Sequence, residues 1–400
     1  MTSPTALATT LRAPGCSRER RTLIVAGMAH ALHDGYTDTI FVLLPGWQAE
    51  FGLGYGMIAM LRGLYAGAMA GLQVPAGSLA NRMGGRVILE LGTALTALGY
   101  LLAGFTGSLP GLCIALAAAG AGSSTQHPVA SAAVARAYGA KARGPLGIYN
   151  FAGDLGKAAF PAVAALLLMR LPWRGMLGLM AALGLAAAIA IGLFMPASEP
   201  GQDPAPETAL RQGGGRGGFP LLFAIGVIDT AVRMGLLTFL PFLLKAKGAA
   251  LPAVGLGLAL VFLGGAGGKF TCGWLGGRLG VLWTVVLTEG GTAAAIFLLL
   301  ALPLTPAMAM LPLLGIMLNG TSSVLYGTVP ELTTADQGER SFALFYTGTI
   351  GAGAVSPVLF GLLGDAVGVT WAAAATAITA LATLPLAVAL APHLAKDQGI

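Results

Sequence analysis

The sequence has few charged residues for its length. Asp, Glu, Lys and Arg make up 10% of the 400 residues, whereas soluble domains carry about 25%. Hydrophobic residues make up 56%, and the mean hydropathy is +0.80. This composition excludes a water-soluble enzyme, a nucleic-acid-binding protein and a disordered chain. It predicts a polytopic helical membrane protein, in which the 61 glycines allow close helix packing.

Cysteines and catalytic motifs are also scarce. Cys16, Cys113 and Cys272 lie far apart, so no pair suggests a disulfide or a metal clip. The sequence has no P-loop, no Gly-x-Ser-x-Gly and no His-Glu-x-x-His motif. We therefore expect no enzymatic activity, no cofactor and no resident metal. The net charge of +6 is interpreted as basic cytoplasmic loops, so we expect no nucleic-acid partner.

A membrane-spanning helix needs about 20 apolar residues. Proline, glycine and charged positions divide the chain into twelve such segments. They run roughly over 22–45, 55–80, 86–106, 110–137, 144–169, 174–195, 219–245, 253–278, 282–303, 306–330, 340–364 and 369–392. The one long polar break, 196–218, is rich in Pro and Gly, which predicts a flexible linker. The predicted domains are an N-terminal tail (1–21), a six-helix bundle (22–195), the linker, a second six-helix bundle (219–392) and a C-terminal tail (393–400).

The distribution of basic residues predicts the orientation, because cytoplasmic loops carry the excess of Lys and Arg. If the N-terminus is cytoplasmic, the inner segments hold Arg12, Arg18, Arg20, Arg21, Arg82, Arg86, Arg136, Lys141, Arg143, Arg211, Arg216, Arg278, Arg340 and Lys396. The outer loops hold only Arg170, Arg174, Lys245 and Lys247. Both termini, both tails and the linker are therefore predicted to be cytoplasmic. The first residues precede no cleavable apolar stretch, so we do not expect a signal peptide.

The two halves of the sequence repeat each other. Four features recur at offsets of 196 or 198 residues. They are the segments 77–86 and 273–280, the glycines Gly122 and Gly320 that open two small-residue triplets, Pro161 and Pro357, and Trp173 and Trp371. Parallel repeats are typical of transporters whose substrate site lies at the midplane between the halves. The sequence therefore predicts an all-α membrane protein with twelve transmembrane helices in two pseudo-symmetric six-helix bundles.

Two sets of motifs resemble a known family. GSLANRMGGR (77–86) resembles the loop signature Gly-x-Leu-Ala-Asp-Arg-x-Gly-Arg-Arg of the major facilitator superfamily, with Asn81 in place of Asp. More narrowly, the sequence resembles the fosmidomycin-resistance type of efflux proteins. The motifs that carry this likeness are His30-x-x-His33-Asp34, Gln73-x-Pro75-x-Gly77 and Ser123-Ser124-x-x-His127-Pro128. In that type Asn is usual where His33 stands, and Glu is usual where Val129 stands.

The resemblance implies the major facilitator fold and a monomer in a bacterial inner membrane. It also implies efflux by alternating access, and that the third, sixth, ninth and twelfth helices face lipid. The distribution of mid-helix charges agrees, because none falls near the centre of those four predicted helices.

The first predicted helix carries the most informative charges. An ionisable residue inside a membrane helix costs roughly 2.5–3.5 kcal/mol on insertion scales, so it faces a cavity or a partner. His30, Asp34 and Asp38 follow one another at four-residue spacing and share one stripe. Two carboxylates one turn apart disfavour each other's ionised form, so one of them can take up and release a proton. We predict that Asp34 carries the proton, with Asp38 as its neighbour and His30 or His127 as relay.

Two alternatives for this helix stay open. Asp34 could serve only to order polar neighbours within the helix. Alternatively, His30, His33, Asp34 and Asp38 could bind a divalent transition-metal ion.

The other buried charges predict an anion site. Asp154 and Lys157 are three residues apart and Asp229 and Arg233 four, so each pair shares a helix face and could neutralise itself. Arg62 and Lys269 have no local acid, and would either pair across the halves or bind a carboxylate or phosphonate. The predicted substrate-binding residues are His33, Arg62, Gln126, Asn150, Asp154, Lys157, Asp229, Arg233 and Lys269. The predicted cytoplasmic gate consists of Asn81, Arg82, Arg86, Glu90, Arg278 and Glu289.

These features together predict a proton-coupled secondary active transporter that exports a small anionic organic compound. Its partners would be the substrate, protons and the lipid bilayer. Two alternatives within transport are export of a transition metal or metal chelate, and uptake of an organic acid by proton symport. An intramembrane enzyme using His30, Asp34 and His127 would not need duplicated halves. A non-transporting sensor would be expected to carry an appended signalling domain.

Overall fold

The computed structural model describes residues 18–197, 218–333 and 338–394. These ranges contain helices and no strand. The helices of the first half are α1 (Arg18–Phe51), α2 (Tyr55–Gly71), α3 (Gln73–Met83), α4 (Gly85–Phe105), α5 (Leu109–Ser123), the π-helical turn η1 (Gln126–Ala130), α6 (Ser131–Tyr138), α7 (Arg143–Leu167) and α8 (Trp173–Phe194). Those of the second half are α9 (Phe219–Ala246), α10 (Leu251–Ala301), α11 (Leu304–Thr328), α12 (Gly338–Val367), α13 (Val369–Leu381) and α14 (Thr383–Leu390).

These helices make twelve passes through the molecule. Helix α2 continues into α3 across a 43° bend, α5 continues through η1 into α6, and α13 continues into α14. The 51-residue α10 is broken at Gly280, whose φ of 75° lies in the region that favours glycine, and so contributes two passes. Within the described ranges, seven helices are long and apolar enough to cross a membrane, or eight with the bent α2–α3 pair. The prediction of an all-α, twelve-helix membrane protein is confirmed.

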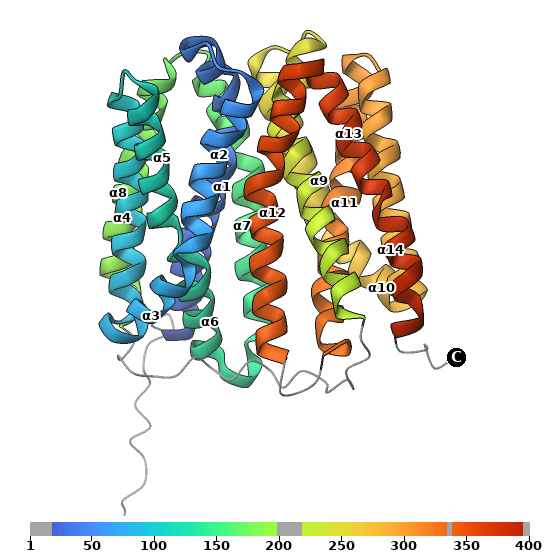
Figure 1. Cartoon of the computed structure of the whole chain (residues 1–400). Coiled ribbons are helices and arrows are strands. Elements are labelled where there is room, and N and C mark those ends of the chain that lie inside the picture. The colour runs from blue at the N-terminus through green and yellow to red at the C-terminus, as the bar shows by residue number, and fades with distance from the viewer. Residues whose placement is uncertain (1–17, 198–217, 334–337, 395–400) are drawn as a thin grey trace, which may run out of the picture.

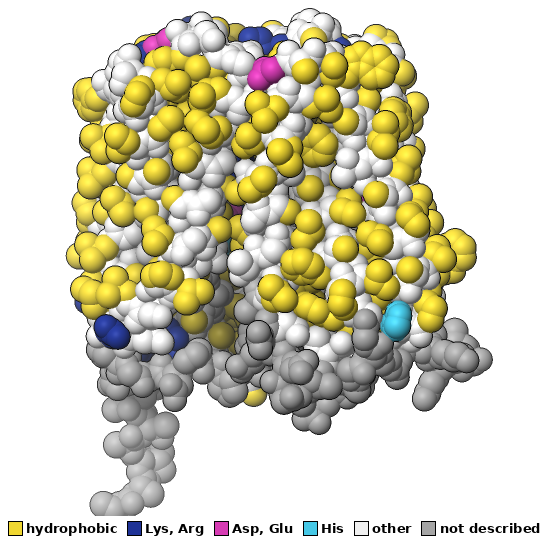
Figure 2. Space-filling model, viewed as in Figure 1, with side chains coloured by type: hydrophobic (Ala, Val, Ile, Leu, Met, Phe, Trp, Pro, Cys, Tyr) yellow, Lys and Arg dark blue, Asp and Glu magenta, His cyan; other side chains and the backbone are white. Residues whose placement is uncertain are grey.

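The helices form two bundles that lie side by side (Figure 1). Helices α1–α8 make the first bundle and α9–α14 the second. Helix α8 ends at Phe194, and α9 begins at Phe219. Both described ends of the chain lie at the same end of the molecule, which we call the termini end. Hydrophobic side chains cover the middle of the face seen in Figure 2, and charged ones gather near its two ends, as expected for a protein surrounded by lipid. The predicted tails and most of the linker fall on 1–17, 198–217 and 395–400, outside the described residues.

The hydrophobic core joins the two bundles only away from the termini end. One buried cluster runs through both bundles and includes Trp47 of α1 and Leu240 of α9. Toward the termini end lie two further clusters. One belongs to the first bundle and contains Leu89, and the other belongs to the second and contains Val285. Within the described residues, the bundles are therefore packed together at the opposite end and separate toward the termini end.

A carboxylate closes the opposite end. Asp365, at the end of α12, accepts hydrogen bonds from the backbone N–H groups of Tyr55 (2.5 Å) and Gly56 (3.0 Å) at the start of α2. Gly54, the N-cap residue of α2, supplies no side-chain cap of its own. A Cβ added at Gly54 would lie 2.7 Å from the Asp365 carboxylate, so glycine is needed for this close approach. A carboxylate at a helix N-terminus satisfies free N–H groups and complements the helix dipole. Asp365 therefore ties the second bundle to the first.

We predict that Asp365→Asn loosens the contact between the bundles at the opposite end. The amide keeps the shape of the side chain but loses the charge that strengthens both hydrogen bonds. In a variant without native cysteines, spin labels at the exposed positions Ala49 and Ala366 should report a new population at longer distance. Glu50→Gln is the matched control, because Glu50 pairs with Arg174 within the first bundle at 2.6 Å. An unchanged distance distribution in Asp365→Asn would show that this cap does not hold the bundles together.

Candidate functional site

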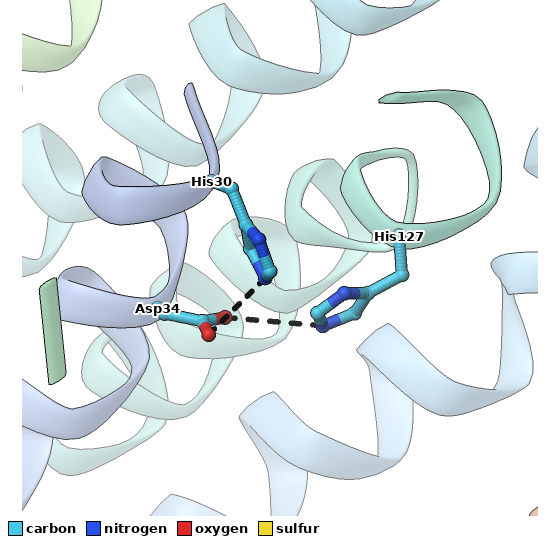
Figure 3. Close-up of side chains that lie close together, drawn as sticks. All are labelled: His30, Asp34 and His127. Carbon is cyan, nitrogen blue, oxygen red and sulfur yellow. Dashed lines mark ion pairs between the residues drawn. The ribbon is translucent and has the colours of Figure 1, made fainter. Parts of the chain in front are cut away.

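Asp34 of α1 is the centre of a buried cluster of basic side chains. Its Oδ2 atom lies 3.2 Å from His30 Nε2 and 3.2 Å from Lys157 Nζ. Its Oδ1 atom lies 3.8 Å from His33 Nε2 and 3.9 Å from His127 Nε2. Figure 3 shows His30 and His127 reaching the Asp34 carboxylate from two different segments. Asp34 is only 5% exposed. One buried carboxylate therefore lies within 4 Å of four basic side chains.

Two local features of the chain build this cluster. Glycine at 153 lets α7 approach α1, because an added Cβ would lie 2.7 Å from Asp34 Oδ2 and 2.8 Å from His30 Nε2. His127 stands in the π-helical turn η1 beside Pro128, which has no backbone N–H to donate. Such π-helical turns occur frequently at functional sites. The turn brings the imidazole of His127 to within 5.2 Å of that of His30 (ring centroids).

His30 is oriented by a backbone carbonyl and faces Asp34 through its second ring nitrogen. His30 Nδ1 lies 2.9 Å from the backbone carbonyl of Tyr149, and the two rings are stacked at 4.1 Å. A carbonyl oxygen only accepts, so Nδ1 carries a hydrogen and a neutral imidazole then has a bare Nε2. That atom faces Asp34 Oδ2, and two lone pairs at this distance would repel each other. A proton taken up at this contact would turn the repulsion into a hydrogen bond between the two side chains.

Two neighbours of the Asp34 carboxylate are partly exposed. The side chain of Asp34 is 6% exposed, whereas those of His127 and Lys157 are 34% and 33% exposed. His127 therefore touches both the buried carboxylate and the accessible space. This is the arrangement that a proton relay needs.

The Asp154–Lys157 pair within α7 that the spacing suggested does not form. Lys157 turns to Asp34, and Asp154 instead accepts two hydrogen bonds from Lys269 Nζ, at 2.6 and 2.8 Å. Because Asp154 lies in α7 and Lys269 in α10, this pair joins the two bundles. Of the two uses foreseen for Lys269, the structure shows pairing across the halves.

Two arginines, the buried Arg62 and the half-buried Arg233, face the interface from opposite bundles. Arg62 of α2 is 4% exposed and lies over the ring of Phe41, 5.0 Å from its centroid. Arg233 of α9 lies 3.9 Å from Asp229 Oδ2, so the predicted i,i+4 pair is present but long. Among the described residues, the buried Nε of neither arginine has a hydrogen-bond partner. Asp38, 6% exposed, lies within electrostatic range of both guanidinium groups. Unused donors on both sides of an interface are suited to an anion.

The other predicted substrate-binding and gate residues are spread over several parts of the structure. Gln126 is buried beside His127, and its Nε2 has no partner among the described residues. Asn150 is exposed on α7 and lies outside the buried cluster. Of the predicted gate, Asn81, Arg82 and Arg278 are exposed and Arg86 is half-buried, while Arg278 lies 4.4 Å from the ring of Trp274. Glu90 packs against Gly192 of α8 within the first bundle.

Glu289, the last residue of the predicted gate, is buried inside the second bundle. Glu289 is 2% exposed and its Oε1 accepts a hydrogen bond from Thr321 of α11 at 2.8 Å. It follows the break at Gly280 by nine residues, about 13 Å along a helix, which carries it away from the termini end. There it faces Asp229. An ionisable residue therefore does lie deep in the ninth pass, where none was expected.

The sequence interpretation missed Tyr149 and Gly153, which position His30. A signal was present: Tyr149, Gly153 and Gly156 recur at spacings of four and three and share the face of α7 that packs on α1. Because these small and aromatic residues carry no formal charge, the pattern of charged residues did not indicate them.

The cluster around Asp34 also offers metal-ligand atoms. One ligand atom each of His30, Asp34 and His127 lies within 4.8 Å of the others. Two imidazoles and a carboxylate suit a divalent transition metal. However, the ammonium of Lys157 lies 3.2 Å from the same carboxylate and repels a second cation there.

Comparison with known proteins places this architecture in a family. The family model described as Major Facilitator Superfamily matches residues 25–219 and 222–399. A probable L-galactonate transporter of Escherichia coli (strain K12) is 28% identical over 149 residues, 37% of this chain and 32% of that protein. The fosmidomycin resistance protein of the same strain is 28% identical over 141 residues, 35% of each chain. Each match spans only about a third of the relative. The predicted resemblance is confirmed.

Solved structures share the fold over nearly the whole chain. A bacterial homologue of the human lysosomal transporter Spinster, in an inward-facing and occupied conformation, has a TM-score of 0.78 at 15% identity and covers 96% of this chain and 100% of its own. The nucleoside transporter NupG has a TM-score of 0.77 at 11% identity, covering 94% and 100%. A peptide transporter in complex with alafosfalin has a TM-score of 0.74 at 15% identity, covering 94% and 96%. At 11–15% identity, these likenesses show the fold.

We predict that Asp154 and Lys269 are coupled energetically. Removing either charge with Asp154→Asn or Lys269→Gln should lower thermal stability, and the double variant should lose less than the sum. Because the side chain of Lys269 is 41% exposed, the coupling should be only about 1 kcal/mol. Thermal unfolding of the purified protein in detergent measures this cycle. Additive losses in the double variant would mean that the contact does not stabilise the junction between the bundles.

Proposed function

Because the chain belongs to the Major Facilitator Superfamily, a family of membrane transporters, we propose that it is a proton-coupled transporter of a small organic anion. The membrane would be a bacterial inner membrane, with the termini end in the cytoplasm. The observation that carries the proposal is the buried Asp34 carboxylate, which lies 3.2 Å from His30 and from Lys157 and 3.9 Å from the partly exposed His127. A buried carboxylate that contacts several imidazoles, one of them partly exposed, is suited to proton coupling.

Arg62 and Arg233 are the proposed anion site. They approach from opposite bundles, and each keeps a buried Nε free of protein partners among the described residues. A planar guanidinium binds carboxylate and phosphonate groups through paired hydrogen bonds. An anion that bridges both arginines would link its own binding to the relative position of the bundles. Alternating access requires such a link.

The names of the two relatives supply the first compounds to test. L-Galactonate is a sugar carboxylate and fosmidomycin is a phosphonate, so both carry the kind of group that two arginines bind. Neither match covers enough of the relative to transfer its substrate to this chain.

Export by proton antiport is the first candidate for the direction of transport, and the likeness to the fosmidomycin resistance protein supports it. In this cycle Asp34 takes up a proton from the outer side, which permits return to the arrangement that separates toward the cytoplasm. Proton release then accompanies binding of the anion.

Uptake by proton symport is the second candidate, and the charges between the bundles favour it. When Glu289 is counted as neutral, four acids (Asp34, Asp38, Asp154 and Asp229) balance four bases (Arg62, Lys157, Arg233 and Lys269). An anion alone would leave a net negative charge in a low-dielectric site, whereas an anion with a proton keeps the site neutral. The sign of proton movement separates the two directions.

We predict that Asp34→Asn abolishes proton movement coupled to the substrate, because the amide cannot ionise. Purified protein in liposomes with an internal pH dye would receive gradients of L-galactonate, fosmidomycin, other carboxylates and Zn²⁺ in turn. Proton movement with one of the anions is expected in the wild type and not in Asp34→Asn.

Glu50→Gln is the matched control for this experiment, because it removes a carboxylate at the opposite end of the same helix. It should leave coupling intact. Unimpaired coupling in Asp34→Asn would falsify the proposed proton carrier. A response to Zn²⁺ alone would reassign His30, Asp34 and His127 to a metal substrate.

We predict that Arg62→Gln weakens binding of the transported anion by about tenfold to a hundredfold, the range for losing hydrogen bonds to a charged group. Arg62→Lys should recover part of the loss, because it keeps the charge but not the planar donor pair. Titration calorimetry on the purified protein gives both affinities. Arg174→Gln is the control, since Arg174 pairs with Glu50 away from the interface. Equal affinities for the wild type and Arg62→Gln would remove Arg62 from the anion site.

A further inference from the structure

We propose that Asp229 and Glu289 form a second proton-binding site, a carboxyl pair in the second bundle that holds one proton between its two members. Its part in transport rests on the proposed function, but its protonation stands on the structure alone. The site is separate from the Asp34 cluster, because Asp229 belongs to α9 and Glu289 to the second pass of α10.

The pair is deeply buried. Asp229 is 3% exposed and Glu289 is 2% exposed, and the two carboxyl groups face each other. Buried carboxylates so close together cannot both stay ionised without compensating charge, because water no longer screens their repulsion.

The surrounding helices supply too little positive charge for two carboxylates. Among the described residues, the one cation facing the pair is Arg233 of α9, whose Nη2 lies 3.9 Å from Asp229 Oδ2. The other polar neighbours are neutral. Helix α11 contributes Thr321, at 2.8 Å from Glu289 Oε1, and Tyr326, which lies 3.1 Å from the Thr349 hydroxyl of α12. One guanidinium beside two ionised carboxylates would leave an uncompensated buried negative charge.

A single orphaned atom identifies which member carries the proton. Glu289 Oε2 is buried and has no hydrogen-bond partner among the described residues, whereas its Oε1 accepts from Thr321. Protonation turns Oε2 into a donor that can reach an acceptor, and Asp229 supplies an ionised one in front of it. Asp229 stays ionised because it is the member beside Arg233. The arrangement resembles acid dyads in which like charges force two carboxyl groups to share one proton.

Arg233 connects this proton to the proposed anion site. It is the pair's cation and also one of the two arginines offered to the anion. If the guanidinium moves away from Asp229, the positive charge that favours two ionised carboxylates is lost. The proton affinity of the pair then increases. Arg233→Gln should therefore shift release of this proton to higher pH, an effect that a merely structural role would not produce.

Infrared spectroscopy of the full chain in lipid nanodiscs tests the site. A protonated carboxylic acid has a C=O stretching band that ionised carboxylates lack and that moves on exchange into D₂O. At neutral pH in sodium-free buffer, the difference between wild type and Glu289→Gln should contain one such band. Asp229→Asn should move this band in frequency, since the acid then faces an amide. Arg233→Gln should keep it to higher pH than the wild type does.

Asp365→Asn is the matched control and should show no difference in this band, because both carboxylate oxygens of Asp365 accept from N–H groups. If Glu289→Gln does not fold, Thr321→Val replaces it. This variant keeps both acids but removes the hydrogen bond to Glu289, so it should change the frequency of the band. Absence of an acid band from all of these difference spectra would overturn the proposal. Loss of the band on adding Na⁺ would also overturn it, because the pair would then be a sodium site. Failure of coupling through Asp34 does not affect this band, so the two proposals fail separately.

Discussion

The cost of an ionisable side chain inside a membrane constrains the rest of this structure. Two deep carboxylates find their partners on other helices: Asp34 with Lys157 of α7, and Asp154 with Lys269 of α10. These contacts gather along the junction between the two bundles, where partners from several helices converge. The same requirement leaves two places with an imbalance. The arginines Arg62 and Arg233 have unused donors, and the acids Asp229 and Glu289 have too few cations. Anion binding and proton binding are the chemical consequences of these two imbalances.

The packing of the two bundles gives these charges a mechanical role. The bundles share a hydrophobic core at the opposite end, where Asp365 also caps α2, and have separate cores toward the termini end. The charged junction lies between the packed end and the separated end of the two bundles. Lys269 and Asp154 form an ion pair across it. Rocking about this junction would exchange the packed end for the separated one without unfolding either bundle. Binding at residues from both bundles can bias that motion, because it acts on their relative position.

Much of this architecture could be predicted from the sequence, because it depends on local patterns. Apolar length and punctuation gave the twelve passes, and four-residue spacing gave the stripe on which His30 and Asp34 meet. Partner choice could not be predicted. Lys157 contacts Asp34 rather than Asp154 because Gly153 brings α7 against α1, a consequence of helix packing. The depth of Glu289 could not be predicted because the break at Gly280 sets how far its helix carries it inward. The Asp365 cap joins residues about 310 positions apart, which no local pattern encodes.

The central claim is that anion binding and protonation are thermodynamically linked in one protein. Titration of the purified transporter with its tightest-binding carboxylate or phosphonate, repeated in buffers of different ionisation enthalpy, measures this linkage directly. The account predicts that the observed heat varies with the buffer in proportion to about one proton exchanged per anion. Release of the proton indicates antiport and uptake indicates symport. A binding heat that is the same in every buffer would contradict the account.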